Sequence, residues 1–137
     1  MAAELFTQSW IEAWCQALQN DPTYNEAAKN WQGAIIFTML ADAEAGLSED
    51  RSVYLDLSGG NCHGGRIATS DDFEAAPYVV TGEAAAWMEL LEGQTDPLMS
   101  LMSGKLRLTK GNMMSLIPHT AAARALLQVA LKINDAA

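Results

Sequence analysis

The residues that could do chemistry are few and far apart in this chain. Cys62 and His63 are adjacent and His119 lies much further along, so a thiolate, a base or three metal ligands are conceivable. Adjacent residues on a strand point to opposite faces, and no fourth ligand stands at a recognisable spacing. We therefore interpret Cys62 as a turn-flanking thiol and His63 as a solvated histidine, and we expect His119, after Pro118, to help start the last helix. The sequence predicts no catalytic residue, no metal site and no cofactor.

A glycine-rich segment and an acidic cluster follow one another in the middle of the chain. The segment SGGNCHGGR lacks the spacing of a P-loop or a dinucleotide site. It leads into a strand, so we expect no helix N-terminus there that could bind a phosphate. We interpret it as a hairpin. Asp71, Asp72 and Glu74 are interpreted as a solvated loop, because a calcium loop needs more ligands at alternate positions. An enzyme that uses Cys62 or a carboxylate pair is therefore the least supported class.

Charge and composition restrict the class of protein further. The chain has 137 residues, 50% of them apolar, and a net charge of −9, so we expect one domain over residues 1–137 and no nucleic-acid partner. Residues 97–134 contain no acidic residue, and their basic residues are Lys105, Arg107, Lys110, Arg124 and Lys132. Ion pairs with acids elsewhere on the surface are the simpler interpretation of this asymmetry, and an anion-attracting rim is the alternative.

Three features concern the compartment. Cys15 and Cys62 form no CxxC motif and are too few for a disulfide framework, which fits a reducing compartment. The first residues lack the pattern of a secretory signal. The longest apolar run, residues 34–41, is far shorter than the roughly 20 residues that cross a bilayer. We therefore expect a cytoplasmic protein.

The hydrophobic periodicity predicts an α+β fold. Helices are expected over residues 4–19, 24–31, 82–91, 97–103 and 120–133, with a short helical segment after Gly111, and strands over 33–40, 52–57, 66–69, 78–81 and 105–110. Thr81 is expected to cap one helix, and Asp96 followed by Pro97 to start the next, which Gly104 ends. Hairpins together with helices gathered at the ends of the chain favour α+β over a doubly wound parallel sheet.

The later part of the chain resembles the sterol carrier protein type 2 family of lipid-binding domains, above all over DPLMSLMSGKLRLTKGNMM. In that family a strand leads to a helix that ends in glycine, followed by a short acidic-proline helix, a Ser-Gly-Lys-Leu entry to an alternating strand, a glycine and a Met-rich segment. The counterparts here are 82–93, Asp96-Pro97, Ser103-Gly104-Lys105-Leu106, Gly111 and Met113-Met114. Asn112 stands where the family commonly has an acid.

The resemblance implies a five-stranded, mainly antiparallel sheet covered by helices. It also implies an apolar tunnel that holds a fatty acid, fatty acyl-CoA, sterol or other lipid, without catalysis. The domain also occurs in this family as an accessory module fused to enzymes.

Methionines give independent support for an apolar site, since five of them fall between residues 88 and 114. Unbranched thioethers adapt to irregular shapes, as a promiscuous pocket requires, although gap-filling in an ordinary core is the alternative. With the resemblance, we expect nine side chains to line the cavity: Trp87, Met88, Leu91, Met99, Met102, Leu106, Met113, Met114 and Leu126. Lys105, Arg107 or Lys110 would meet an anionic head group at the rim.

The cost of an empty cavity limits its size. A void of ~300 Å³ at ~24 cal/mol per Å³ costs about 7 kcal/mol, which is comparable to the stability of a whole domain. We therefore expect a cavity that is partly collapsed, hydrated or filled with lipid. The resulting hypothesis is a non-catalytic carrier of an apolar small molecule. The alternative to this carrier hypothesis is a protein-interaction or regulatory module with a vestigial pocket. Transient membrane contact or a homodimer is compatible with both hypotheses.

Overall fold

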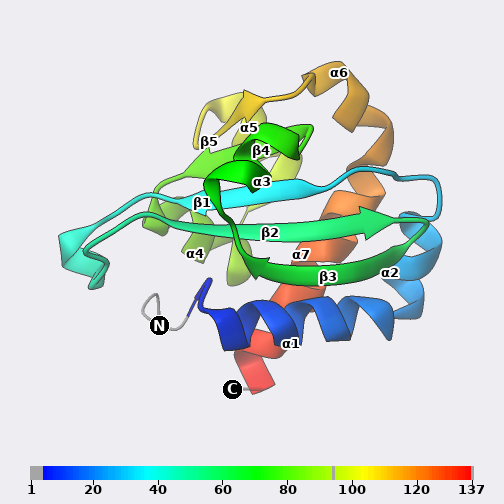
Figure 1. Ribbon diagram of the computed structural model, residues 1–137, viewed down its shortest axis with the longest axis horizontal. Helices are drawn as coiled ribbons and strands as arrows, with labels where there is room; N and C mark the ends of the chain where they lie inside the picture. The colour runs from blue at the N-terminus through cyan, green and yellow to red at the C-terminus, as the bar shows by residue number, and fades with distance from the viewer. Residues whose placement is uncertain (1–4, 94, 137) are drawn as a thin grey trace.

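The computed structural model describes residues 5–93 and 95–136 and arranges them as a five-stranded sheet with helices on both faces (Figure 1). The strands are β1 (Ile35–Met39), β2 (Arg51–Ser58), β3 (Asn61–Ile67), β4 (Tyr78–Gly82) and β5 (Leu106–Lys110). Their order in the sheet is β3-β2-β1-β4-β5, and only the β1 and β4 pair is parallel. The mainly antiparallel α+β architecture expected from the sequence is thus confirmed.

The helices divide unequally between the two faces of the sheet. The inner face, which carries the main core, is covered by α1 (Gln8–Gln19), α4 (Ala84–Leu91) and α7 (Thr120–Ala136), with α2 (Pro22–Ala27) and α5 (Pro97–Ser103) beside them. The outer face carries α3 (Ser70–Ala75) over a small second cluster. The single turn α6 (Met113–Leu116) and the 3₁₀ turn η3 (Ile117–His119) join β5 to α7, and another 3₁₀ turn, η2 (Ala43–Ala45), lies between β1 and β2.

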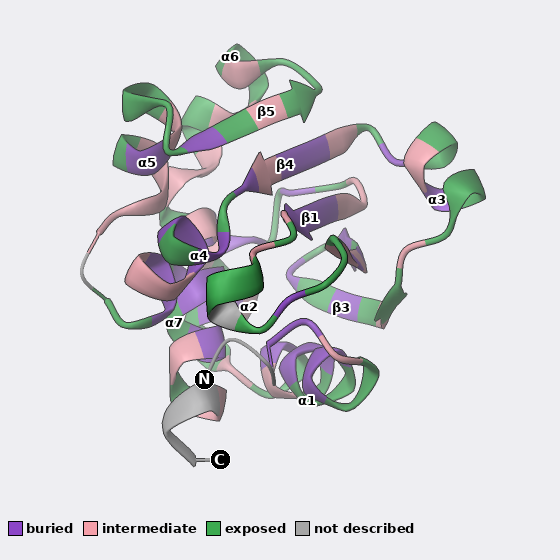
Figure 2. Ribbon diagram, turned by 90° about the vertical axis from the view of Figure 1, so that its left-hand side faces the viewer, coloured by how far each residue is buried: buried purple, intermediate pink, exposed green. Residues whose placement is uncertain are grey.

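Side-chain alternation orients each strand, as the sequence indicated. Val53, Leu55 and Leu57 of β2 are fully buried on the inner face, whereas Asp56 is exposed. The central strands β1 and β4 are buried on both faces (Figure 2), which explains the apolar run IIFTM. The predicted alternation of β5 is also confirmed, because Leu106 is buried and its neighbours are exposed.

The predicted hairpin is present, with Gly59 and Gly60 as its turn. Both have positive φ, 62° and 84°, which suits a tight two-residue connection. A Cβ at Gly60 would collide with the backbone carbonyl of Asn25, so α2 also requires glycine there. β3 begins at Asn61, directly after the turn, and not at residue 66 as expected, because the glycines of NCHGG pair with β2 despite their low strand propensity.

Two local expectations are wrong. Asp71, Asp72 and Glu74 lie in helix α3, not in a loop, because the Thr69 side chain accepts from the Asp72 amide and the Asp72 carboxylate accepts from the Thr69 amide. Thr81 belongs to β4 and does not cap α4, whose N-cap position is Glu83 without a side-chain hydrogen bond. Asp96, by contrast, caps α5 as expected.

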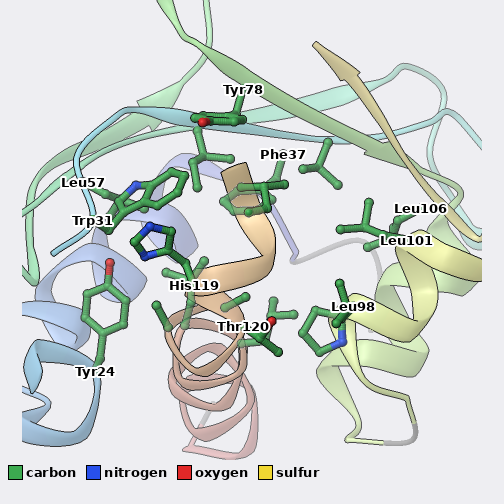
Figure 3. Close-up of a pocket in the computed structure, with 18 of the residues that line it drawn as sticks. Tyr24, Trp31, Phe37, Leu57, Tyr78, Leu98, Leu101, Leu106, His119 and Thr120 are labelled. Atoms are coloured by element: carbon green, nitrogen blue, oxygen red, sulfur yellow. The ribbon is translucent and has the colours of Figure 1, made fainter. Parts of the chain in front are cut away.

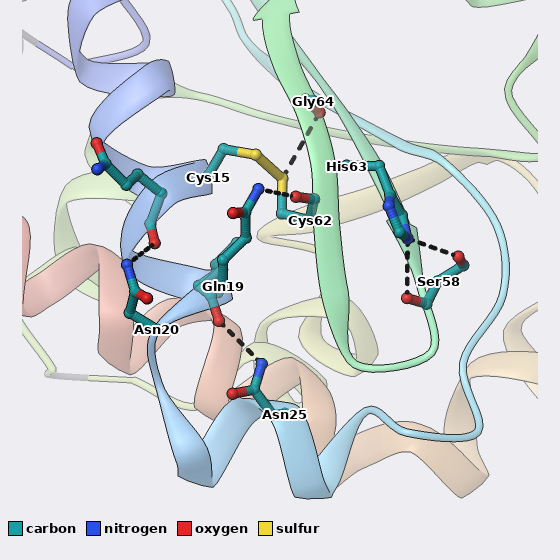
Figure 4. The surroundings of a disulfide bond; sticks show 10 residues. Cys15, Gln19, Asn20, Asn25, Ser58, Cys62, His63 and Gly64 are labelled. Atoms are coloured by element: carbon teal, nitrogen blue, oxygen red, sulfur yellow. Dashed lines mark hydrogen bonds between the residues drawn. A yellow bond between two sulfur atoms is a disulfide. The ribbon is translucent and has the colours of Figure 1, made fainter.

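A disulfide joins Cys15 of α1 to Cys62 of β3 (Figure 4), so the interpretation of Cys62 as a turn-flanking thiol is wrong. Their Cα atoms are 5.4 Å apart although 47 positions separate them, because α1 lies across the edge strand. Gly65 permits this approach, since a Cβ there would lie 3.0 Å from Ile11 Cγ2. His63 points away from the bond and is exposed, with its Nε2 3.0 Å from Ser58 Oγ.

Candidate ligand-binding pocket

An apolar pocket of about 90 Å³ lies between the inner face of the sheet and the helices α2, α5 and α7 (Figure 3). Its walls are almost entirely carbon, and among the described residues that line it none is Lys, Arg, Asp or Glu. The cavity is smaller than the ~150 Å³ cavity that holds benzene in an engineered protein. At ~24 cal/mol per Å³ a void of this size costs about 2 kcal/mol, which a domain can tolerate.

Four neighbouring strands supply the sheet wall through their inward positions: β2 contributes Leu57, and β1, β4 and β5 contribute the rest. Phe37 of β1 is in register with Val80 of β4, and Val80 with Leu108 of β5, so alternate residues of all three strands face the same side. Tyr78 precedes Val80 on that face, and Leu106 closes the β5 edge.

Helix α7 forms the opposite wall. Thr120, Ala123 and Leu127 follow one another at helical spacing and line the pocket, as do Ala122 and Leu126. The alanines leave room that larger side chains would fill. The short helices at the other side contribute Leu98 and Leu101 from α5, and Leu116 from α6.

Two tryptophans hold the pocket in shape. The indole N–H of Trp87 donates to the carbonyl oxygen of Thr38 at 2.9 Å, and its ring stands edge-on to Phe37. The indole N–H of Trp31 donates to the carbonyl oxygen of Gly33 at 2.8 Å. Because both buried donors are satisfied inside the protein, both rings are fixed in place without competing for hydrogen bonds with an occupant.

Of the nine side chains expected to line the cavity, three lie in the pocket wall and six lie outside it. Trp87, Leu106 and Leu126 lie in the pocket wall. Leu91 is buried and Met88 half-buried in the core around α4, outside the lining, and Met113 is half-buried in α6. Met99, Met102 and Met114 are exposed by 62%, 70% and 71%. Contact of these six with a ligand stays a prediction.

Sixteen of the nineteen lining residues were missed by the sequence reasoning, and four of these sixteen are aromatic residues with a polar atom: Tyr24, Trp31, Tyr78 and His119. Tyr78 could have been found, because it occupies the same strand face as Val80. The other three come from α2, the loop before β1 and η3, and no local pattern connects them. His119 directly precedes α7, and its ring also contacts Trp31 edge-on in the pocket wall.

The basic residues of the segment 97–134 are mostly paired, as the simpler interpretation held. Lys105 lies 3.2 Å from Glu89, Arg124 2.5 Å from Asp96 and Lys132 3.4 Å from Asp21. Lys110 donates to the backbone carbonyls of residues 73 and 74. Within the described part of the chain, no group of three or more His, Cys, Asp and Glu is placed to hold a metal ion. The described helices include none that is long and apolar enough to span a membrane.

The fold and the pocket define an α+β domain with an apolar cavity between a mostly antiparallel sheet and its helices. The model of the SCP-2 sterol transfer family matches residues 11–117, and the chain belongs to this family. The resemblance seen in the sequence is thereby confirmed. No curated protein matches the chain.

Solved structures agree with this assignment. A crystal structure of sterol carrier protein 2 is 36% identical, covers 94% of this chain and 98% of its own, and has a TM-score of 0.85. A solution structure of a conserved hypothetical protein from Thermus thermophilus, possibly a sterol carrier protein, is also 36% identical. The match covers 95% of this chain and 90% of that protein, with the same TM-score of 0.85. The Aedes aegypti sterol carrier protein-2 in complex with palmitate is 14% identical, covers 88% and 98%, and has a TM-score of 0.51, which shows a shared fold alone.

Proposed function

We propose that this protein binds and carries an apolar small molecule with an acyl-like chain, without catalysis. The observation that carries the proposal is the almost entirely apolar cavity between the sheet and α7, in a chain of the SCP-2 sterol transfer family. The palmitate held by the Aedes aegypti protein of the same fold supports an acyl chain as the ligand class. Burial of each methylene of such a chain contributes about 0.8 kcal/mol to binding.

The cavity must widen to take a long chain, since its volume is only about 90 Å³. The elements best suited to move are α5 and α6, because they are short and lie at one end of the sheet (Figure 1). α6 has no buried residue (Figure 2). Displacement of Leu98, Leu101 and Leu116 would open the tunnel that the family resemblance implies.

The carrier function would include transient contact of α5 and α6 with a membrane. Met99 and Met102 of α5 and Met114 of α6 expose large apolar side chains, while Leu98 and Leu101 of α5 face inward. The segment that bears these methionines carries no acidic residue in a chain with a net charge of −9. An anionic membrane would therefore be repelled least by this end of the molecule.

A cytoplasmic location is a separate part of the proposal. The disulfide between Cys15 and Cys62 counts against it, because disulfides persist mainly in oxidising compartments. The fraction of the two thiols that is oxidised in cells, measured by alkylation and mass spectrometry, tests this part separately. Predominantly reduced thiols would support the cytoplasm, and a fully oxidised pair would contradict it.

The carrier function is tested with the purified full chain. Native mass spectrometry and solvent extraction should find a bound lipid, or a fluorescent fatty acid should bind at micromolar concentration. If neither is observed, the carrier proposal fails. A mass that rises with protein concentration in light scattering, with no lipid uptake, would instead favour the interaction module with a vestigial pocket, including a homodimer.

A further inference from the structure

The polar atoms in the pocket wall are not equivalent. Those of Trp31, Trp87 and Thr120 donate to backbone carbonyls at 2.7 to 2.9 Å and are thus occupied. The hydroxyls of Tyr24 and Tyr78 and the imidazole of His119 have no hydrogen-bond partner among the described residues. Tyr24 is buried and Tyr78 and His119 are half-buried, and all three polar groups can hydrogen-bond an occupant of the pocket.

Tyr24 is the strongest case, because only 2% of it is exposed. Its ring rises from α2, and the hydroxyl points into the pocket on the side where His119 and Trp31 lie (Figure 3). Burial raises the pKa of Tyr24 to about 12, so the hydroxyl keeps its proton and remains a donor at any physiological pH. Among the described residues the fully enclosed side-chain polar atom without a partner is Trp10 Nε1, so the Tyr24 hydroxyl is not fully enclosed and can donate to an occupant of the pocket.

His119 is held on the same side of the pocket by an aromatic contact. Its ring stands edge-on to Trp31 with centroids 4.8 Å apart, and Trp31 in turn contacts Tyr78 at 5.1 Å. In any protonation state an imidazole offers at least one N–H donor. The opposite side of the pocket is aliphatic, with Leu98, Leu101 and Leu106 (Figure 3).

The pocket therefore has one end that can hydrogen-bond and one end that cannot. We propose that Tyr24 and His119 form a head-group subsite that takes the carboxyl or hydroxyl group of a single-chain amphiphile, whose tail lies toward Leu98, Leu101 and Leu106. This inference rests on the proposed carrier function and specifies the class of ligand. The lining contains no Lys or Arg, so a doubly charged phosphate has no permanently charged partner inside the pocket and is disfavoured.

The subsite is tested by displacement of an apolar fluorescent dye with four ligands of equal chain length: dodecane, dodecan-1-ol, dodecanoic acid and dodecyl phosphate. The wild-type chain should bind the alcohol and the acid at least fivefold more tightly than dodecane, which corresponds to one hydrogen bond. Dodecyl phosphate should bind more weakly than the acid. Equal affinity for dodecane and the alcohol, or tightest binding of the phosphate, would overturn the inference.

Matched variants assign the effect to the two side chains. Tyr24→Phe and His119→Phe keep an aromatic ring, and each should lower affinity for the alcohol and the acid about fivefold while leaving dodecane unchanged. Tyr54→Phe is the control, because its ring lies on the outer face under Arg66, with the guanidinium 4.3 Å from its centroid. Equal loss for all ligands would show a merely structural role. Failure of the dye itself to bind would contradict the carrier function, whereas dye binding without head-group discrimination would contradict the subsite alone.

Discussion

His119 and Trp31 meet edge-on in the wall of the apolar pocket, with ring planes at 80°. One ring precedes the first strand and the other precedes the last helix, so the contact joins segments near opposite ends of the chain. Tyr78 of β4 joins this pair through its own contact with Trp31. The aromatic end of the pocket is thus built by tertiary structure, and its chemistry depends on the whole fold.

Substitution of Ala123 by a large side chain should weaken ligand binding without unfolding the protein. Ala123 lines the pocket from α7 and is half-buried, so Ala123→Phe would place a ring in a space of about 90 Å³. Such overpacking costs typically about 1–3 kcal/mol, which a domain can survive. We expect at least a tenfold loss of affinity for a fluorescent fatty acid, with an unchanged circular dichroism spectrum. Ala121→Phe, exposed on the same helix, is the control; unaltered binding by Ala123→Phe would contradict the assigned site.

Reduction of the disulfide should destabilise the protein. The bond between Cys15 and Cys62 closes a loop of 47 positions, for which chain entropy gives a stabilisation of about 4 kcal/mol and measurements typically give about 2–4 kcal/mol. The midpoint of urea unfolding should therefore fall when dithiothreitol is added. The double variant Cys15→Ala and Cys62→Ala should be insensitive to the reductant. If the wild-type midpoint does not move, the bond is absent in solution.

A carboxylate introduced at the methionine-rich end should weaken membrane contact. Met102→Asp and Met114→Asp each replace an apolar side chain that is at least 70% exposed with a negative charge. We expect several-fold less co-sedimentation with vesicles that contain anionic lipid, because both apolar burial and electrostatic attraction are reduced. Ile67→Asp is the matched control, since Ile67 is 50% exposed on β3, at the opposite edge of the sheet. An equal loss in the control would exclude docking at this end.

Local patterns predicted the elements well. The alternation of β5, the Gly59-Gly60 turn and the Asp96 cap all rest on residues close in sequence, and each is present. The spacing of apolar residues along α5 was harder to interpret. Leu98 and Leu101 share one face and Met99 and Met102 another, so periodicity alone did not show which pair faces the pocket.

Relationships between distant segments were not predictable in this way. Nothing near Cys15 indicates that α1 lies across β3, and nothing near Tyr24 or His119 indicates a shared pocket, because strand order and helix docking determine both. The organisation of residues 1–137 as one domain stays a prediction. The family resemblance supplied the expectation of a cavity, but its wall in this chain is more aromatic and less rich in methionine than we expected.

Low pH should reduce the stabilisation that the Asp72 carboxylate gives to the protein through its contacts at the start of α3. The carboxylate of Asp72 accepts hydrogen bonds from Arg66 at 2.5 and 3.2 Å and from the Thr69 amide at 2.9 Å, and these hold the pKa of Asp72 below its ordinary value of 3.8. Because the pKa is lower in the folded state, the stabilisation is complete above pH 3.8 and is lost as the pH falls through the folded-state pKa. Asp72→Asn should therefore lower the free energy of unfolding by about 1 kcal/mol at pH 7 and by less at pH 3, measured by urea titration. Asp71→Asn, on the exposed side of α3, is the control, and an equal deficit of Asp72→Asn at both pH values would contradict the ionic contribution.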